Sequence, residues 1–194
     1  MKLVSAQNIT YSINENKLFH NISFEINSRE GLHIKGGNGS GKSTLLRIIL
    51  GITSPSKGLI ERCNEDLKIS YLGHKNAIKN YLTPIENLEL LFNDIEIKLA
   101  YEWLHKFGLS HVQDELAASL SFGQQKKLAL IRVLAKSQEL IVLDEPFVGL
   151  DQTTADQLNN FLDKKLSDGV GLILTSHINP MINCKVLDLG EKNV

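Results

Sequence analysis

The glycine-rich stretch at residues 36–44 constrains the fold of this chain more than any other feature. Glycine allows positive φ angles and a close approach of the backbone, so that several N–H groups can point at one anion. A strand-like run at residues 31–35 precedes the stretch, and an apolar, helix-like run at residues 44–50 follows it. Because N–H groups at a helix N-terminus lack partners and favour negative charge, this order predicts a strand, a phosphate-binding loop and a helix.

The loop carries the side chains that handle a nucleoside triphosphate. Lys42 is expected to reach the β- and γ-phosphates of ATP, and the Ser43 hydroxyl is expected to ligate Mg²⁺. The sequence therefore predicts that the chain binds ATP and Mg²⁺. The residues expected to hold the nucleotide here are Gly36, Gly37, Asn38, Gly39, Ser40, Gly41, Lys42, Ser43 and Thr44.

The composition argues against several classes of partner. Of 194 residues, 21 are basic and 22 are acidic, so we expect neither a nucleic-acid-binding field nor an acidic tail. Cys63 and Cys184 show no metal-binding or redox spacing, which favours two reduced thiols in a cytosolic protein. No apolar run reaches the ~18–20 residues of a membrane span, and the N-terminus lacks the apolar core of a signal peptide. We therefore expect no direct membrane insertion and no nucleic-acid partner.

The alternation of polar and apolar residues predicts an α/β chain with a helical insert. Residues before the loop alternate like antiparallel strands, with polar turns at 14–16 and 27–29. Apolar runs late in the chain are typical of a parallel sheet covered on both faces. Further strands are expected at 58–61, 68–72, 140–143, 170–175 and 185–189, and helices at 84–92, 97–107 and 124–134.

We expect this to be one domain over residues 1–194, with a mainly parallel core sheet and an N-terminal antiparallel β part. Residues 1–75 and 136–194 would form the catalytic core. Residues 76–135 would form an inserted helical subdomain.

Two carboxylates follow one of the apolar strands. Asp144 and Glu145 come directly after residues 140–143, and ligands meet a parallel sheet at such carboxyl ends. Asp144 is expected to hold Mg²⁺ and Glu145 to polarise the attacking water, although an exposed acid at a strand end would look the same. His177 follows the next strand, where it could sense the γ-phosphate or serve as a structural histidine.

Ser121 and Gly123 stand just before an amphipathic helix. The N-terminus of that helix is a second potential anion site. A serine at this position is also an ordinary N-cap residue, so the local sequence leaves both interpretations open.

Taken in order, these motifs resemble the ATP-binding cassette (ABC) family over nearly the whole chain. The phosphate loop is followed by the signature Leu-Ser-Phe-Gly-Gln at 120–124, the magnesium strand at 140–145, a dimer-contact loop at 149–151 and the switch histidine His177. The resemblance implies a P-loop NTPase fold of the ABC type and a head-to-tail cassette dimer. Each ATP would lie between the phosphate loop of one subunit and the signature of the other. The nucleotide-binding residues in the signature and dimer-contact loop would be Ser121, Gly123, Gln124 and Asp151.

Residues 71–88 carry a narrower resemblance. Gly73-His74, followed by Ile-Lys, Leu-Thr and Glu-Asn-Leu, is similar to the ATP-binding subunits of the cytochrome c maturation family, also called haem exporter ATPases. This resemblance implies an integral membrane partner and ATP hydrolysis that drives haem handling. Most cassettes have glutamine where His74 stands. We expect His74 to position water or Mg²⁺ and to act with Lys42, Glu145 and His177 in catalysis.

Two positions depart from the ABC pattern. Phe122 replaces the usual glycine of the signature, and its ring could pack on a neighbouring helix or on the ribose. The aromatic residue that stacks on adenine in the family would fall near Ile13. Tyr11 lies two residues earlier on the same strand face and is the candidate adenine contact.

The resemblance therefore implies a peripheral ATPase subunit at the cytoplasmic face of the inner membrane. We expect its integral membrane partner to dock near residues 75–82, Lys75 to Leu82, where Tyr81 and Leu82 could anchor it. This segment could instead be a solvated loop. The alternative functions are the ATPase of another ABC transporter and a soluble ABC ATPase such as a metal-cluster assembly factor.

Overall fold

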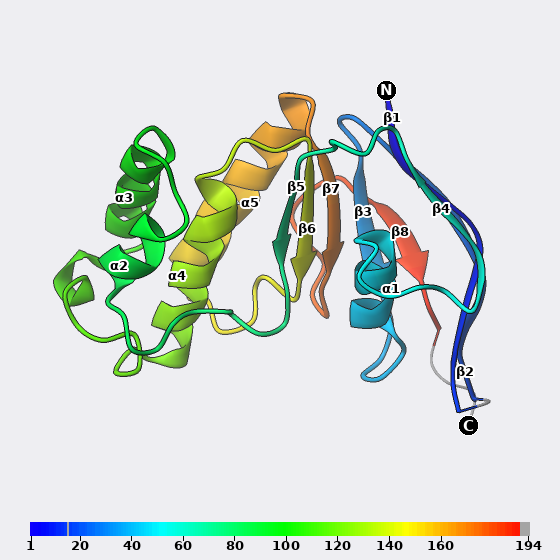
Figure 1. The fold of residues 1–194 in the computed structure, drawn as a ribbon, viewed down its shortest axis with the longest axis horizontal. Coiled ribbons are helices and arrows are strands. Elements are labelled where there is room, and N and C mark those ends of the chain that lie inside the picture. The colour runs from blue at the N-terminus through cyan, green and yellow to red at the C-terminus, as the bar shows by residue number, and fades with distance from the viewer. Residues whose placement is uncertain (15, 191–194) are drawn as a thin grey trace.

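The structure of the chain is a computed structural model that describes residues 1–14 and 16–190. These residues form two sheets and a group of helices arranged in layers (Figure 1). The strands are β1 (Lys2–Ile13), β2 (Asn16–Asn27), β3 (Gly31–Lys35), β4 (Lys57–Arg62), β5 (Ile69–Leu72), β6 (Leu140–Asp144), β7 (Gly171–Thr175) and β8 (Lys185–Asp188). The α-helices are α1 (Lys42–Ile49), α2 (Pro84–Glu89), α3 (Glu96–Lys106), α4 (Phe122–Leu134) and α5 (Gln152–Ser167), and Ser110–Val112 forms a 3₁₀ turn.

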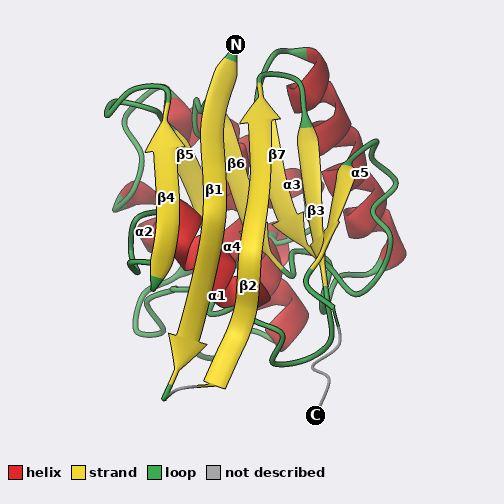
Figure 2. Cartoon of the chain, turned by 90° about the vertical axis from the view of Figure 1, so that its right-hand side faces the viewer, coloured by secondary structure: helices red, strands yellow, loops and turns green. Residues whose placement is uncertain are grey.

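The outer layer is an antiparallel sheet with the strand order β2–β1–β4 (Figure 2). The predicted antiparallel part is confirmed, and β1 and β2 are two long paired strands. Register shifts interrupt their pairing, and Asn8 and Asn21 adopt positive φ angles, so bulges explain the broken alternation in the sequence. Glu15, in the predicted turn between the two strands, lies outside the described residues.

The inner layer is a parallel sheet with the order β5–β6–β7–β3–β8. Every residue of β6 and β7 is buried. Helix α1 lies on one side of this sheet, toward the antiparallel layer, and α4 and α5 lie on the other side (Figure 1). The predicted parallel sheet with two covered faces is therefore confirmed.

Helix α5 is the one long element that the sequence analysis does not predict. Its sequence is mostly polar, and its buried stripe includes Leu158, Leu162 and Leu166, spaced four residues apart. Asp151 caps the helix, because its carboxylate accepts a hydrogen bond of 2.9 Å from the Thr154 amide. Because few apolar side chains mark its buried face, the sequence pattern predicts this helix only weakly.

The predicted helix at Pro84 begins where expected, with a capping box between Thr83 and Glu86, but it ends early at Glu89. One hydrophobic cluster joins this helical region to the parallel sheet, with Leu104 and Leu128 packed in the same cluster as Leu143. The division into a catalytic core and a helical subdomain therefore stays a prediction. Within the described residues, no helix has the length and apolar character needed to cross a membrane.

Candidate nucleotide-binding site

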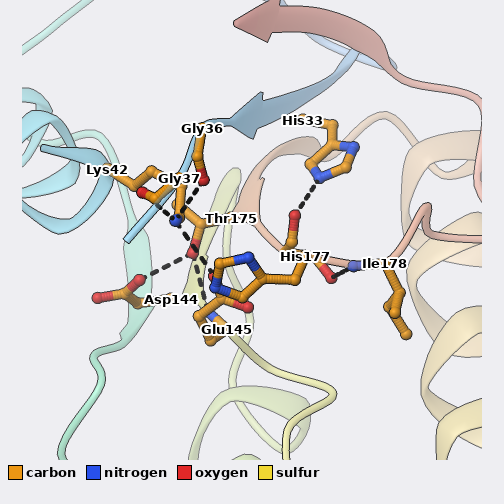
Figure 3. A network of polar contacts seen from close by, with 10 residues as sticks. His33, Gly36, Gly37, Lys42, Asp144, Glu145, Thr175, His177 and Ile178 are labelled. Atoms are coloured by element: carbon orange, nitrogen blue, oxygen red, sulfur yellow. Dashed lines mark hydrogen bonds and ion pairs between the residues drawn. The ribbon is translucent and has the colours of Figure 1, made fainter. Parts of the chain in front are cut away.

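Three neighbouring strands end together at the edge of the parallel sheet where the predicted site residues lie. In the register of β3, β7 and β6, Ile34 pairs with Thr175, and Thr175 pairs with Asp144. The phosphate loop, the segment carrying His177 and the residue Glu145 therefore leave the sheet from one edge (Figure 3).

A cavity of about 450 Å³ opens at this edge, a size within the range of small-molecule sites. The structure thus brings together the phosphate loop, both predicted carboxylates and both predicted histidines. The lining residues are Ile13, Leu18, Gly37, Asn38, Gly39, Ser40, Gly41, Lys42, Ser43, Thr44, His74, Asp144, Glu145 and His177.

The loop conformation explains its glycines. Gly41 is the N-cap of α1 with φ 100°, in the left-handed region. A Cβ at this position would lie 2.8 Å from side-chain carbons of Leu18 and Phe19, which pack from β2. Glycine at residue 41 therefore lets the loop turn into the helix while β2 closes on it.

Lys42 is held inside the loop. Its Nζ donates hydrogen bonds to the carbonyl oxygens of Gly36, at 2.8 Å, and Gly37, at 3.3 Å. The same ammonium lies 3.8 Å from Oε1 of Glu145. The positive charge therefore stands between the backbone cradle and the strand-end carboxylates, where a bound phosphate would meet it.

The two carboxylates have different surroundings. Asp144 is 1% exposed, and its Oδ1 accepts a hydrogen bond of 2.8 Å from the Thr175 hydroxyl. Glu145 has a φ angle of 49°, which is unusual for a residue with a side chain. Its Oε1 lies 3.4 Å from Nε2 of His177. The buried aspartate and the turned glutamate therefore point into one site from consecutive positions.

A buried histidine supports the segment before His177. His33, on β3, is 2% exposed, and its Nε2 lies 3.0 Å from the carbonyl oxygen of Ser176, where the ring N–H can donate. Burial lowers the pKa of His33, with a smaller lowering by Lys35, while the Ser176 contact and Glu145 oppose the shift. Burial of the ring therefore disfavours protonation of His33 in the folded chain.

The signature residues do not line this cavity. Ser121 is the N-cap of α4, where its hydroxyl accepts from the Gln124 amide at 3.2 Å and its own amide donates to the Gln124 side chain at 2.8 Å. The two interpretations of Ser121 are thus compatible, because an N-cap serine also marks a helix N-terminus that favours anions.

The dimer-contact loop is fixed to the signature helix by charge. Asp151 forms an ion pair of 2.6 Å with Lys127 of α4. The hydrogen bond from Lys127, with help from the Thr154 amide, lowers the pKa of Asp151 to about 2. Next to this pair, the Phe122 ring fills the space beside Gly149, where an added Cβ would lie 2.5 Å from the ring. The unusual Phe122 therefore packs on the dimer-contact loop, and it remains 61% exposed.

The structure does not bring Tyr11 to the cavity. Its ring stacks on Phe19 with 6.2 Å between centroids, and Ile13 lines the cavity instead. Three further residues of the site, Thr175, His33 and Lys127, belong to no motif recognised in the sequence. Of these, only Thr175 left a usable signal, as a hydroxyl residue at the end of an apolar strand.

The fold and the site define a P-loop ATPase. Residues 19–148 match the family described as ABC transporter. The chain is similar to the cytochrome c biogenesis ATP-binding export protein CcmA of Dechloromonas aromatica (strain RCB), at 34% identity over 90% of this chain and 92% of the relative. The protein of the same name from Escherichia coli (strain K12) is 32% identical, over 91% of this chain and 90% of that protein.

Solved structures agree with this assignment. The dimeric structure of MJ0796, a bacterial ABC transporter cassette, matches with a TM-score of 0.81 at 26% identity, over 99% of this chain and 97% of that chain. A post-hydrolysis dimer of the MJ0796 cassette bound to ADP and Pi matches with a TM-score of 0.77 at 27% identity, over 91% and 88% of the two chains. The chain belongs to the ABC transporter family and is an ATP-binding, ATP-hydrolysing cassette.

Substitution of His33 by glutamine should reduce the acid sensitivity of folding. Because the pKa of His33 is lowered in the folded state, the unfolded chain binds a proton more strongly, and stability falls as the pH drops below about 6.5. Urea denaturation at about pH 7.5 and pH 5.5 should show a smaller loss of unfolding free energy for His33→Gln than for the parent, by up to ~1.4 kcal/mol per pH unit. His20→Gln, at an exposed histidine, is the control. The same pH dependence in parent and His33→Gln would contradict this account.

Proposed function

We propose that this ATPase is the cytoplasmic subunit of a membrane transporter complex in c-type cytochrome biogenesis, where ATP hydrolysis energises haem handling. The observation that carries the proposal is the meeting of Lys42, Asp144, Glu145 and His177 at one sheet edge, in a chain similar to named cytochrome c biogenesis ATP-binding export proteins. The integral membrane partner would place the cassette at the cytoplasmic face of the inner membrane as a peripheral subunit.

The donor set at the sheet edge fits Mg²⁺. Oδ2 of Asp144 is buried and has no hydrogen-bond partner among the described residues, while Oδ1 is held by Thr175. Magnesium prefers oxygen ligands and is often bound by few protein groups together with substrate phosphates. Ser43 and Asp144 would hold the ion, which would neutralise charge on the β- and γ-phosphates. His74 also lines the cavity, and we propose that it positions water or the ion.

The catalytic step is attack of water on the γ-phosphate, in line with the leaving ADP. Glu145 accepts the proton of the water, Lys42 stabilises charge on the phosphate oxygens, and His177 contacts the γ-phosphate. The short distances from Glu145 to Lys42 and His177 support these roles, because one phosphate could reach all three groups. The products are ADP and inorganic phosphate.

The signature residues would act on the nucleotide of a second subunit. Ser121, Gly123, Gln124 and Asp151 are displayed outside the cavity that contains the phosphate loop. A head-to-tail dimer would place the N-terminus of α4 against the γ-phosphate of the facing subunit. The dimeric form of similar cassettes supports this arrangement.

Replacement of Glu145 by glutamine should preserve ATP binding and reduce hydrolysis by about 10²-fold to 10⁴-fold, because a general base is lost. Gel filtration with ATP should then show an ATP-bound dimer that the parent does not accumulate. Phosphate release measures hydrolysis and nucleotide affinity measures binding, so both measurements on the same preparation separate a loss of hydrolysis from a loss of binding. Undiminished hydrolysis by Glu145→Gln would exclude Glu145 as the base.

We propose residues 75–82 as the docking segment for the membrane partner. Tyr81 is 70% exposed, although aromatic residues are usually covered. The backbone beneath it is fixed, since the buried Asn87 side chain accepts from the Lys79 amide at 2.8 Å and donates to the Lys79 carbonyl at 3.0 Å. A rigid backbone that presents one large aromatic side chain suits an anchor in a partner's groove.

The docking segment is also tied to the signature helix. Arg132 of α4 donates to the carbonyl oxygens of Asn76, at 3.1 Å, and Ala77, at 2.8 Å. The segment follows His74 of the nucleotide cavity directly. Movement at the nucleotide could therefore reach the partner through the chain after His74 or through α4.

Tyr81→Ala should weaken membrane association without weakening ATP binding, because the side chain lies outside the nucleotide cavity. The readout is the fraction of cassette that sediments with membranes when it is co-expressed with its membrane partner. Leu59→Ala, which removes another exposed apolar side chain, from β4, serves as the matched control. Equal sedimentation of the parent and Tyr81→Ala would place docking elsewhere.

A further inference from the structure

Thr175 contacts both acidic residues of the site, the carboxylate of Asp144 and the backbone amide of Glu145. It ends β7, is fully buried at 0% exposure, and pairs in register with Asp144 of β6. Its hydroxyl donates to Oδ1 of Asp144 at 2.8 Å and accepts from the backbone amide of Glu145 at 2.9 Å. The single hydroxyl of Thr175 therefore donates its hydrogen to the Asp144 carboxylate and accepts a hydrogen bond from the Glu145 backbone amide (Figure 3).

The contact to Glu145 acts on an unusual backbone conformation. Glu145 has a φ angle of 49°, in the left-handed region that residues with a Cβ seldom adopt. Such a conformation persists only where surrounding contacts maintain it. The bond from the Glu145 amide to Thr175 is a contact of this kind, and the conformation it supports directs the Glu145 carboxylate toward Lys42 and His177.

The contact to Asp144 sets the orientation of that carboxylate. With Oδ1 occupied by the Thr175 hydroxyl, Oδ2 is the oxygen left without a hydrogen bond among the described residues, and it is buried. A hydrogen bond to one carboxylate oxygen restricts rotation of the group and so helps to orient the other oxygen. The Thr175 contact therefore favours one orientation of Oδ2 of Asp144.

We propose that Thr175 is a positioning residue that sets the base Glu145 and the magnesium-binding Asp144 together through its single hydroxyl. This inference rests on the proposed function, because it gives Thr175 a task only if Glu145 activates water and Asp144 holds Mg²⁺. A hydroxyl is required for both contacts. A side chain of the same shape without oxygen would leave the Asp144 oxygen and the Glu145 amide unpaired in a buried place.

The test compares Thr175→Val, which keeps the shape and loses the hydroxyl, with Thr175→Ser, which keeps the hydroxyl. Thr175→Val should lower kcat by on the order of tenfold to a hundredfold with little change in KM, since misplaced catalytic groups lose rate more than binding. Thr175→Ser should restore most of kcat. Thr10→Val is the control, because Thr10 is also buried, does not line the nucleotide cavity, and has a hydroxyl that accepts from the Asn21 amide in the antiparallel sheet.

A second readout does not depend on turnover. The affinity for a fluorescent ATP analogue, measured with and without Mg²⁺, should show a Mg²⁺-dependent gain in the parent, in Thr175→Ser and in Thr10→Val. Thr175→Val should show a smaller gain and an unchanged affinity without Mg²⁺, because the phosphate loop is intact. Thermal unfolding of each variant identifies a protein that has simply lost its fold.

The outcomes separate this inference from the proposed function. If the parent hydrolyses ATP and Thr175→Val keeps both kcat and the Mg²⁺-dependent gain, Thr175 positions nothing and the inference is wrong. If Thr175→Ser is as impaired as Thr175→Val, the hydroxyl is not the cause, and the inference is again wrong. Full hydrolysis by Glu145→Gln would instead overturn the assignment of the base, on which the proposed function stands.

Discussion

The register of three parallel strands fixes the positions of the groups at this site. Ile34, Thr175 and Asp144 stand side by side on β3, β7 and β6, so the next residues along each strand leave the sheet at one edge. Side chains alternate between the faces of a strand, and a shift of one residue would turn Asp144 away from Thr175. The continuous burial of β6 and β7 stabilises the strands that hold this register.

Charged side chains gather at this edge of the parallel sheet, and several of them are buried away from water. Asp144 is almost fully buried, Glu145 contacts Lys42 and His177, and Lys126 of α4 is only 3% exposed. Burial lowers the pKa of Lys126, and the charges of Asp144 and Glu145 oppose that shift. Helix α4 thus carries a buried lysine whose charge interacts favourably with the acids of the site. Interactions between such charges are stronger than in water, which suits a site that must stabilise phosphate in transfer.

The sequence predicted the parts of the site that depend on local chemistry. The phosphate loop is recognised by the glycines and the lysine within residues 36–44. Asp144 and Glu145 are recognised because they directly follow an apolar strand. Helix α5 was missed because few apolar residues mark it. Tyr11 does not line the cavity although Ile13 does, and register shifts interrupt the pairing of β1 on both sides of Tyr11. The contact of Thr175 is with Asp144, 31 positions away, and that of His33 is with Ser176, 143 positions away, so the sequence alone does not show which groups they hold.

The central claim is that the phosphate loop of one subunit and the signature of another form each hydrolytic site, and mixing two inactive variants tests it directly. Lys42→Ala removes the loop cation, while Ser121→Asp keeps an N-cap residue but repels phosphate. In a head-to-tail dimer, a mixed pair has one site that retains both Lys42 and Ser121. Each variant alone should be inactive, and an equal mixture should regain roughly a quarter of the parent's ATPase rate, if exchange is random and sites act independently. A mixture that stays as inactive as its components would contradict a site shared between subunits.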